Sequence, residues 1–195
     1  MSEPVDLRAL IADKPPKTGK VRFIAVDGHG GSGKSTFARW LADRLGAELV
    51  TQDDFASWDN PFDWWPQVIE KIFVPITAGA KTLSYPRSQW WEHHKPEPVV
   101  DQPVTDIMIL EGVSSSRSEF RDYISLSIFI DTPIELCLKR GVERDKVTGK
   151  SEEELTEMWE GWMKGEETYF NRDNPKENAD IVVDGTRPFE DQVKL

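Results

Sequence analysis

Residues 21–36 read VRFIAVDGHGGSGKST, and this stretch decides the fold class. Its first part is short, apolar and rich in β-forming residues, which predicts a buried strand. Its second part fits the pattern G-x-x-x-x-G-K-[ST] and leads into residues 34–45, whose apolar positions recur at helical spacing. A glycine-rich turn between a strand and a helix lets backbone N–H groups surround phosphate oxygens at the positive end of the helix. The stretch therefore predicts a phosphate-binding loop.

The loop predicts a set of residues that contact a nucleotide. This set is Gly28, His29, Gly30, Gly31, Ser32, Gly33, Lys34, Ser35 and Thr36. The Lys34 ammonium would reach the β- and γ-phosphates as a catalytic cation, and the Ser35 hydroxyl would bind Mg²⁺. The sequence shows no partner for the His29 side chain, so we expect His29 to be a loop residue without a catalytic role.

The same glycines also fit a dinucleotide-binding pattern, G-x-G-x-x-G, through Gly28, Gly30 and Gly33. Asp53 lies twenty residues beyond Gly33, where such a fold places a carboxylate on the ribose. Lys34 argues against this alternative, because a cation in the first turn of a helix opposes the helix dipole unless an anion compensates it. A polyphosphate supplies that anion. A phosphate loop is favoured, and a dinucleotide-dependent oxidoreductase is the weaker alternative.

Strand and helix signals alternate along the chain. Beyond the first strand and helix, the predicted strands are 48–51, 107–110, 124–130 and 181–183, and the predicted helices are 2–12, 66–78, 133–145 and 151–169. This alternation predicts an α/β fold with a mostly parallel sheet that helices cover on both faces. The length suits one domain, residues 1–195, with its core at 20–54 and 105–185.

Residues 55–104 differ in character, since they hold five of the eight Trp residues and seven of the thirteen Pro residues. So aromatic a segment is not expected to be a disordered linker. Apart from the helix, we expect little regular structure in it. We interpret it as an excursion that builds an acceptor pocket, with Tyr85, Arg87 and His93 binding the acceptor. The alternative is that its Trp residues pack a helix against the sheet.

Carboxylates follow three of the predicted strands, at the sheet edge where ligands bind in open α/β folds, and one of them, Asp131 before Thr132-Pro133, is typical of a turn or a helix cap. Asp53 and Asp54 follow one strand, and Glu111 follows another. A kinase needs a carboxylate that accepts the proton of the acceptor hydroxyl and helps to hold Mg²⁺. Asp53 and Glu111 are therefore candidates for this chemistry.

A basic segment precedes an acidic one near the C-terminal end. Residues 139–150 carry five basic and two acidic residues, and residues 151–170 carry seven Glu and one Lys. This pattern predicts a mobile lid at 139–150 that brings Arg140 and Arg144 onto the transferring phosphates from one helix face. The alternative is a solvated helix with salt bridges, such as Arg140 with Asp145.

The overall composition argues against several classes of binding partner and site. A net charge of −11 argues against general binding of nucleic acid or of anionic membranes. A single cysteine excludes a disulfide framework and a cysteine-based zinc site. No apolar run approaches the length of about 20 residues that a membrane span needs. We expect a cytoplasmic protein whose partners are ATP and a small-molecule acceptor.

These motifs, in their order along the chain, resemble the uridine kinase-like family of P-loop kinases. Beyond the phosphate loop, the resemblance is carried by Gln52-Asp53-Asp54-Phe55, Pro61-Phe62-Asp63-Trp64, Ile109-Leu110-Glu111-Gly112, Arg140-x-x-x-Arg144-Asp145 and Ala179-Asp180-Ile181-Val182-Val183. The first of these strings is also similar to nicotinamide riboside kinases. The resemblance implies a P-loop fold with a five-stranded parallel sheet, ATP and Mg²⁺ as cofactors, and phosphorylation of a hydroxyl on a nucleoside or ribosylated base.

The resemblance also implies roles for single residues. Asp53 would be the catalytic base and a Mg²⁺ partner, Glu111 would lie on the second metal-binding strand, and Arg140 and Arg144 would act from the lid. Uridine kinases carry a Tyr-Asp-Phe string in the acceptor pocket, whereas this chain has Tyr85-Pro86-Arg87. The identity of the acceptor therefore stays open, as does the alternative of a regulatory ATPase without a small acceptor.

Overall fold

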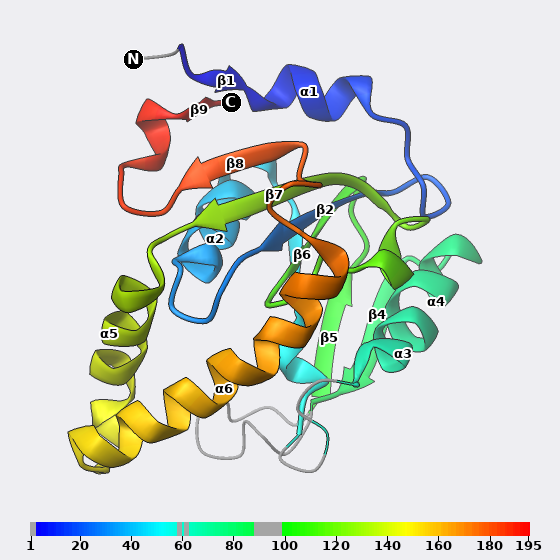
Figure 1. Cartoon of the computed structure of the whole chain (residues 1–195). Coiled ribbons are helices and arrows are strands. Elements are labelled where there is room, and N and C mark those ends of the chain that lie inside the picture. Colours follow the sequence, from blue (N-terminus) through cyan, green and yellow to red (C-terminus); the bar gives the residue numbers. More distant parts are fainter. Residues whose placement is uncertain (1–2, 58–59, 61–62, 88–98) are drawn as a thin grey trace.

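A five-stranded parallel sheet forms the centre of the fold (Figure 1). The computed structural model describes residues 3–57, 60, 63–87 and 99–195. The strands lie in the order β3 (Glu48–Thr51), β6 (Ile107–Glu111), β2 (Arg22–Asp27), β7 (Ile124–Asp131) and β8 (Ile181–Asp184). All four pairings in this sheet are parallel, so the predicted α/β class with a five-stranded parallel sheet is confirmed.

The central strand β2 is apolar on both faces because both faces are covered. Phe23 and Ala25 belong to one buried cluster, and Ile24 and Val26 belong to another. Successive side chains of a strand point to opposite faces, so the two clusters lie on the two sides of the sheet. This arrangement explains the unbroken apolar run in the sequence.

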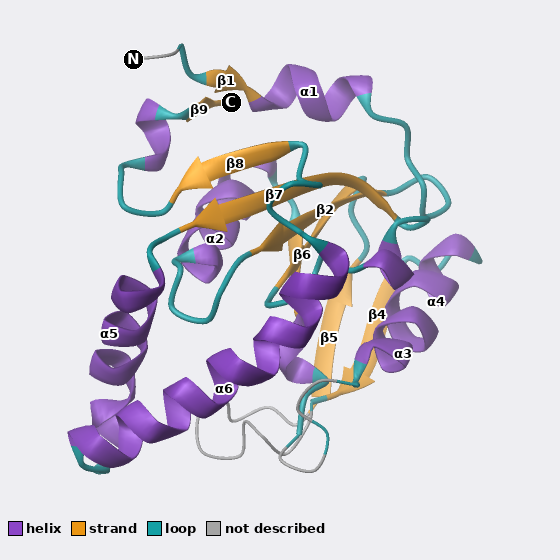
Figure 2. Cartoon of the chain, viewed as in Figure 1, coloured by secondary structure: helices purple, strands orange, loops and turns teal. Residues whose placement is uncertain are grey.

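Helices α1 (Leu7–Asp13) and α2 (Lys34–Leu45) cover one face (Figure 2). Helix α2 has the predicted bounds. Helix α1 begins at Leu7 instead of residue 2, because Asp6 caps it by accepting a hydrogen bond from the Ala9 N–H at 2.9 Å. The residues before it form β1 (Val5–Asp6), which pairs in parallel with β9 (Val193–Lys194).

The segment predicted to be mostly irregular covers the other face, and that prediction is wrong in part. Its helical stretch runs through α3 (Trp65–Val68), a π-helical turn (Ile69–Phe73) and α4 (Val74–Thr77). It also contains an antiparallel hairpin of β4 (Thr82–Pro86) and β5 (Val99–Pro103).

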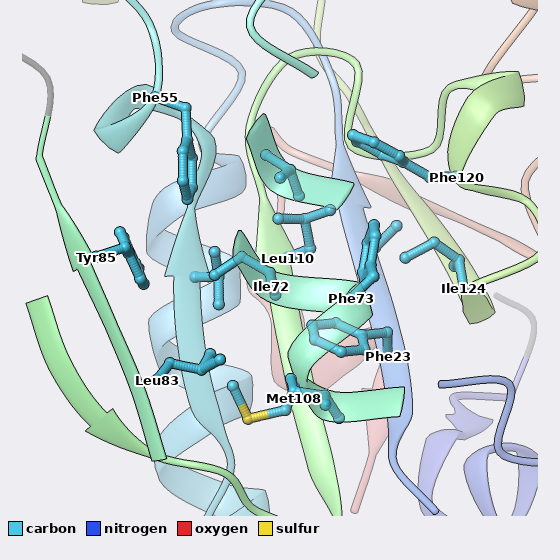
Figure 3. Packing of buried hydrophobic residues seen from close by; sticks show 14 of the residues in the cluster. Phe23, Phe55, Ile72, Phe73, Leu83, Tyr85, Met108, Leu110, Phe120 and Ile124 are labelled. Carbon is cyan, nitrogen blue, oxygen red and sulfur yellow. The ribbon is translucent and has the colours of Figure 1, made fainter. Parts of the chain in front are cut away.

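The hairpin was missed because its strands are short and contain prolines. Strand β4 alternates strictly between buried and exposed positions, with Leu83 and Tyr85 buried. Figure 3 shows both side chains in the cluster that also contains Phe55, Ile72 and Phe73. The aromatic segment therefore contributes much of the core on this face of the sheet.

Helices α5 (Ile134–Asp145) and α6 (Glu152–Asp173) form the remaining layer and meet at the corner of the molecule (Figure 1). A short 3-10 turn, Lys146–Thr148, connects them. The predicted capping box opens α6, since the Ser151 side chain accepts from the Glu154 N–H and Glu154 accepts from the Ser151 N–H. The predicted lid thus consists of the last half of α5 and this turn. Within the described residues, no helix combines the length and the apolar character that a membrane span requires.

Candidate active site

The phosphate loop connects β2 to α2 with the geometry of an anion cradle. Gly33 adopts φ 99° just before the helix, a conformation that favours glycine. Gly31 adopts φ 80°, and a Cβ there would lie 2.2 Å from the Cys137 carbonyl oxygen, so a larger residue would not fit. Among the described residues, none accepts a hydrogen bond from the N–H groups of Gly31, Gly33, Lys34 or Ser35. Such a set of N–H groups at a helix N-terminus suits a phosphate group.

Asp27 anchors the start of the loop and is not among the predicted site residues. Its fully buried carboxylate accepts hydrogen bonds from the Gly28 N–H at 2.7 Å and the Ser114 N–H at 3.0 Å. The Ser116 hydroxyl at 2.7 Å and the Tyr169 hydroxyl at 2.6 Å also donate to it. The residue thereby joins the loop to the segment after β6 and to α6. The feature of the sequence that could have indicated Asp27 is an acidic residue at the end of an apolar strand.

Lys34, Ser35 and Glu111 lie together at the end of the central strands. Glu111 is the residue of β6 paired with Val26, one residue before the end of β2. The Ser35 hydroxyl donates to the Glu111 carboxylate at 3.0 Å. Burial raises the pKa of Glu111, and the nearby Lys34 ammonium opposes that rise. The structure thus brings together two of the three predicted Mg²⁺ ligands, Ser35 and Glu111.

These residues fit a magnesium ion. The described residues contain no cluster of three or more His, Cys, Asp or Glu side chains that could hold a metal by themselves. Mg²⁺ in phosphoryl-transfer sites needs only one or two carboxylates, together with substrate phosphates and water. A hydroxyl beside a buried carboxylate, next to a phosphate cradle, supplies that donor set.

Asp53 and Asp54 lie in a 3-10 turn, Gln52–Asp54, directly after β3. Asp53 exposes its side chain, and its charge contributes to the raised pKa of Glu111. Asp54 is buried and accepts a hydrogen bond from Arg87 Nε at 3.2 Å. Two adjacent carboxylates therefore have opposite environments, and only Asp53 is open to a substrate.

The predicted acceptor residues are distributed between the core and the edge of the site. Tyr85 is 1% exposed and its ring stacks on Phe55 with centroids 5.0 Å apart (Figure 3). Its hydroxyl has no hydrogen-bond partner among the described residues, and burial together with the Asp54 charge raises its pKa. Arg87 is paired with Asp54, as described above. His93 lies outside the described residues, as do Trp90 and Trp91.

The two predicted lid arginines have different contacts. Arg140 donates to the Ser32 carbonyl at 3.3 Å and to the Gly185 carbonyl at 3.2 Å, so its guanidinium lies on the phosphate loop. Arg144 is exposed and pairs with Asp145 at 2.8 Å. The suggested pair of Arg140 with Asp145 is therefore wrong, because Arg144 takes that partner. Only Arg140 contacts the loop in this arrangement.

His29 has side-chain partners that the sequence did not show. Its Nδ1 lies 3.0 Å from Glu166 Oε2, and its ring stacks on Phe170 with centroids 3.9 Å apart. Glu166 Oε1 also accepts a hydrogen bond from the Gly30 N–H at 3.2 Å. These partners come from α6, 137 residues further along the chain, and no local pattern could reveal them.

Comparison with known proteins agrees with the kinase-like features of this site. The family described as "Phosphoribulokinase / Uridine kinase family" matches residues 76–189, more than half of the chain. This match begins after the phosphate loop, so it is independent of the loop. The uridine kinase of Pasteurella multocida is 27% identical over 184 residues, covering 83% of this chain and 84% of its own. That of Halobacterium salinarum is 26% identical over 181 residues, covering 82% and 78%.

Solved structures share the fold. A possible uridine kinase from Bacillus stearothermophilus superposes with a TM-score of 0.58 at 18% identity, covering 84% of this chain and 89% of its own. A protein from Silicibacter sp. TM1040, described as a fructose transport system kinase, superposes with a TM-score of 0.60 at 17% identity. It covers 91% of this chain and 94% of its own. With a phosphate loop, a carboxylate-lined sheet edge and this match, the chain belongs to the phosphoribulokinase/uridine kinase family of P-loop kinases.

Proposed function

We propose that this kinase transfers the γ-phosphoryl group of ATP to a hydroxyl of a nucleoside or ribosylated base, at the carboxyl end of the parallel sheet. One observation carries the proposal most directly. The backbone N–H groups of Gly31, Gly33, Lys34 and Ser35, which have no acceptor among the described residues, lie next to the hydrogen-bonded pair of Ser35 and Glu111. This is a phosphate cradle beside a site for a divalent cation.

The chain's own residues would divide the work as follows. The loop N–H groups and Lys34 would hold the phosphates and neutralise charge that develops during transfer. Ser35, Glu111 and Asp53 would hold Mg²⁺, which would neutralise negative charge on the phosphates. Asp53, whose carboxylate is exposed at the end of β3, would accept the proton of the acceptor hydroxyl.

The buried neighbour of that base would organise the acceptor side. Asp54 and Arg87 form an ion pair at 3.2 Å between the turn after β3 and the end of β4. The pair fixes the position of the turn that carries Asp53. Arg87, His93 and the Tyr85 hydroxyl, which has no hydrogen-bond partner in the described part of the chain, are the polar groups that we assign to acceptor binding. We assign residues 1–195 to one kinase domain, in which residues 55–104 build the acceptor side.

The class of acceptor comes from the relatives. Uridine kinases match most of this chain, which supports a nucleoside. The Gln52-Asp53-Asp54-Phe55 string, which resembles nicotinamide riboside kinases, favours extending the class to ribosylated bases. A cytoplasmic location fits such substrates, and this location is part of the proposal.

An acceptor screen tests the proposal. Purified protein is incubated with ATP and Mg²⁺ and with single nucleosides, nicotinamide riboside or simple sugars, and ADP release and product mass are measured. We expect one class of ribosylated compound to stimulate ADP release and to gain one phosphate. The variant Lys34→Ala controls for contaminating kinases and should be inactive. ATP turnover that no acceptor stimulates would instead indicate a regulatory ATPase.

A further inference from the structure

The helix α6 places an acidic side chain directly on the phosphate loop. Glu166 is buried, with 7% of its side chain exposed. One of its carboxylate oxygens accepts from the Gly30 N–H at 3.2 Å, and the other lies 3.0 Å from the His29 ring. A carboxylate that is held by a loop N–H group occupies the kind of position that a phosphate oxygen takes.

The neighbouring contacts show which part of the loop this carboxylate contacts. Lys34, the cation that reaches the β- and γ-phosphates in such loops, donates to the His29 carbonyl at 3.3 Å. Glu166 contacts the side chain of this same His29 and the N–H of the next residue. The N–H groups of Gly31, Gly33 and Ser35, which have no described acceptor, lie further into the loop. Glu166 therefore contacts the first part of the loop, at the residue that Lys34 also contacts, and this is the end of the cradle that we assign to the γ-phosphate.

Several side chains on one face of α6 pack against the phosphate loop, and the Glu166 contact is one of these. Positions 159, 166, 169 and 170 lie on one side of α6, at the spacing of helical turns. A Cβ on Gly30 would lie 2.8 Å from the Trp159 ring, which shows how closely the helix approaches. Tyr169 donates to Asp27 at 2.6 Å at the start of the loop. Figure 1 shows α6 leading from the end of α5 back to the sheet.

We propose that Glu166 is a resident anion that competes with the γ-phosphate, so that it lowers the affinity of this kinase for ATP more than for ADP. The proposal rests on the proposed role of the loop in binding ATP. Two negative groups at one end of a half-buried cradle, one of them the buried Glu166 carboxylate, repel each other more strongly than they would in bulk water. The γ-phosphate must therefore displace the carboxylate or share its donors, whereas a diphosphate ends before reaching it.

The test separates the charge of Glu166 from its shape. Glu166→Gln keeps the size and the acceptor oxygen but removes the charge. The matched control is Glu167→Gln, which removes the same charge from the exposed next position of α6. Dissociation constants of ATP and ADP, each with Mg²⁺, are measured by calorimetry for the wild-type protein and both variants. The unfolding free energy without nucleotide is measured in parallel, to separate competition from a structural role.

We expect Glu166→Gln to strengthen ATP binding at least about fivefold and ADP binding less than about twofold. Glu167→Gln should change neither by more than about twofold. The nucleotide-free protein should become less stable in Glu166→Gln, because the contact between the carboxylate and the His29 ring is lost. Unchanged or weaker ATP binding by Glu166→Gln would overturn the proposal, because a contact with a structural role alone predicts no gain in ATP affinity. Equal gains for ATP and ADP would also overturn it. If neither nucleotide binds the wild-type protein, the proposed function itself fails.

Discussion

Asp53 and Asp54 show how neighbouring residues of one type take different tasks. The 3-10 turn after β3 directs one carboxylate outward and buries the other against Arg87. A buried carboxylate is stable as an anion only when it is paired, so the ion pair is a structural requirement for Asp54. The carboxylate of Asp53 is exposed, and the proposed function assigns proton transfer to it.

Substitution of each aspartate separates these tasks. Asp53→Asn should lower kcat by about 10²–10⁴ while ATP affinity changes little, because general base catalysis is lost. Asp54→Asn should instead lower the unfolding free energy, because it leaves the Arg87 guanidinium without its buried partner. Steady-state kinetics and urea unfolding of both variants measure the two effects. A larger loss of kcat in Asp54→Asn than in Asp53→Asn would reverse the assignment.

A second prediction at the residue scale concerns the Tyr85 hydroxyl. It is buried without a described partner, so its removal should not destabilise the protein. If this hydroxyl binds the acceptor, Tyr85→Phe raises the acceptor KM by about tenfold, equivalent to about 1.4 kcal/mol, and leaves ATP affinity unchanged. Tyr123→Phe, which alters another ring of the same face, is the matched control. Wild-type acceptor kinetics in Tyr85→Phe would place the pocket elsewhere.

At the scale of elements, α5 carries two arginines with different contacts. Arg140 holds the Ser32 carbonyl of the loop, whereas Arg144 extends toward solvent beside Asp145. A group that contacts the loop before reaction contributes to ground-state binding, and a group that arrives on closure contributes to the transition state.

This difference predicts a split in the kinetics of the two variants. Arg140→Ala should weaken ATP and ADP binding together, because the loop loses a support. Arg144→Ala should lower kcat more than it weakens ATP binding. Lys146→Ala, on the exposed turn after α5, is the control and should be close to wild type. Equal losses of ADP affinity and rate in Arg144→Ala would contradict a role in closure.

The contacts of Asp180, the residue just before β8, predict that the stability of the protein depends on pH. Partial burial acts to raise the pKa of Asp180, but hydrogen bonds from Lys14 and Ser127 outweigh it and lower that pKa. A lowered pKa in the folded state stabilises the protein above the usual Asp pKa, about 3.9, and this contribution is lost as the pH falls through the folded-state pKa.

Asp180→Asn should therefore cost about 1–2 kcal/mol of unfolding free energy at pH 7, and this difference should shrink as the solution is acidified. Urea unfolding at pH 7 and near pH 3 measures it. The exposed Asp106→Asn variant is the control, with little difference expected at either pH. A constant Asp180→Asn deficit at both pH values would show that the carboxylate's charge is not responsible.

At the scale of the whole molecule, the phosphate loop joins the central strand, α2, α5 and α6. A ligand that binds this junction in the folded state alone stabilises the entire domain. ATP with Mg²⁺ at about one hundred times its Kd should add about 2.7 kcal/mol, which raises the Tm by about 5–10 °C. Lys34→Ala should abolish most of the shift. NAD should produce none, and an equal shift with NAD would revive the dinucleotide alternative.

Local signals in the sequence determined the elements that build the site. The strand, glycine turn and helix over residues 21–45 were predicted nearly to the residue, because chain-local conformational rules govern them. The same rules identified the capping box of α6 and the sheet-edge positions of Asp53 and Glu111. The uridine kinase-like resemblance supplied the five-stranded sheet and the class of reaction, which the family match confirms.

Tertiary structure decided which side chains meet. The β4–β5 hairpin forms because its inward side chains find a buried cluster, whereas its prolines and short strands conceal it from a local pattern. The pairing of Arg87 with Asp54 and of His29 with Glu166 depends on elements that are distant along the chain. Such contacts follow from the packing of whole elements, because side-chain partners are selected by distance in the folded molecule. The residue types at each position therefore defined a kinase-like site, and only packing showed that α6 holds a carboxylate on its phosphate loop.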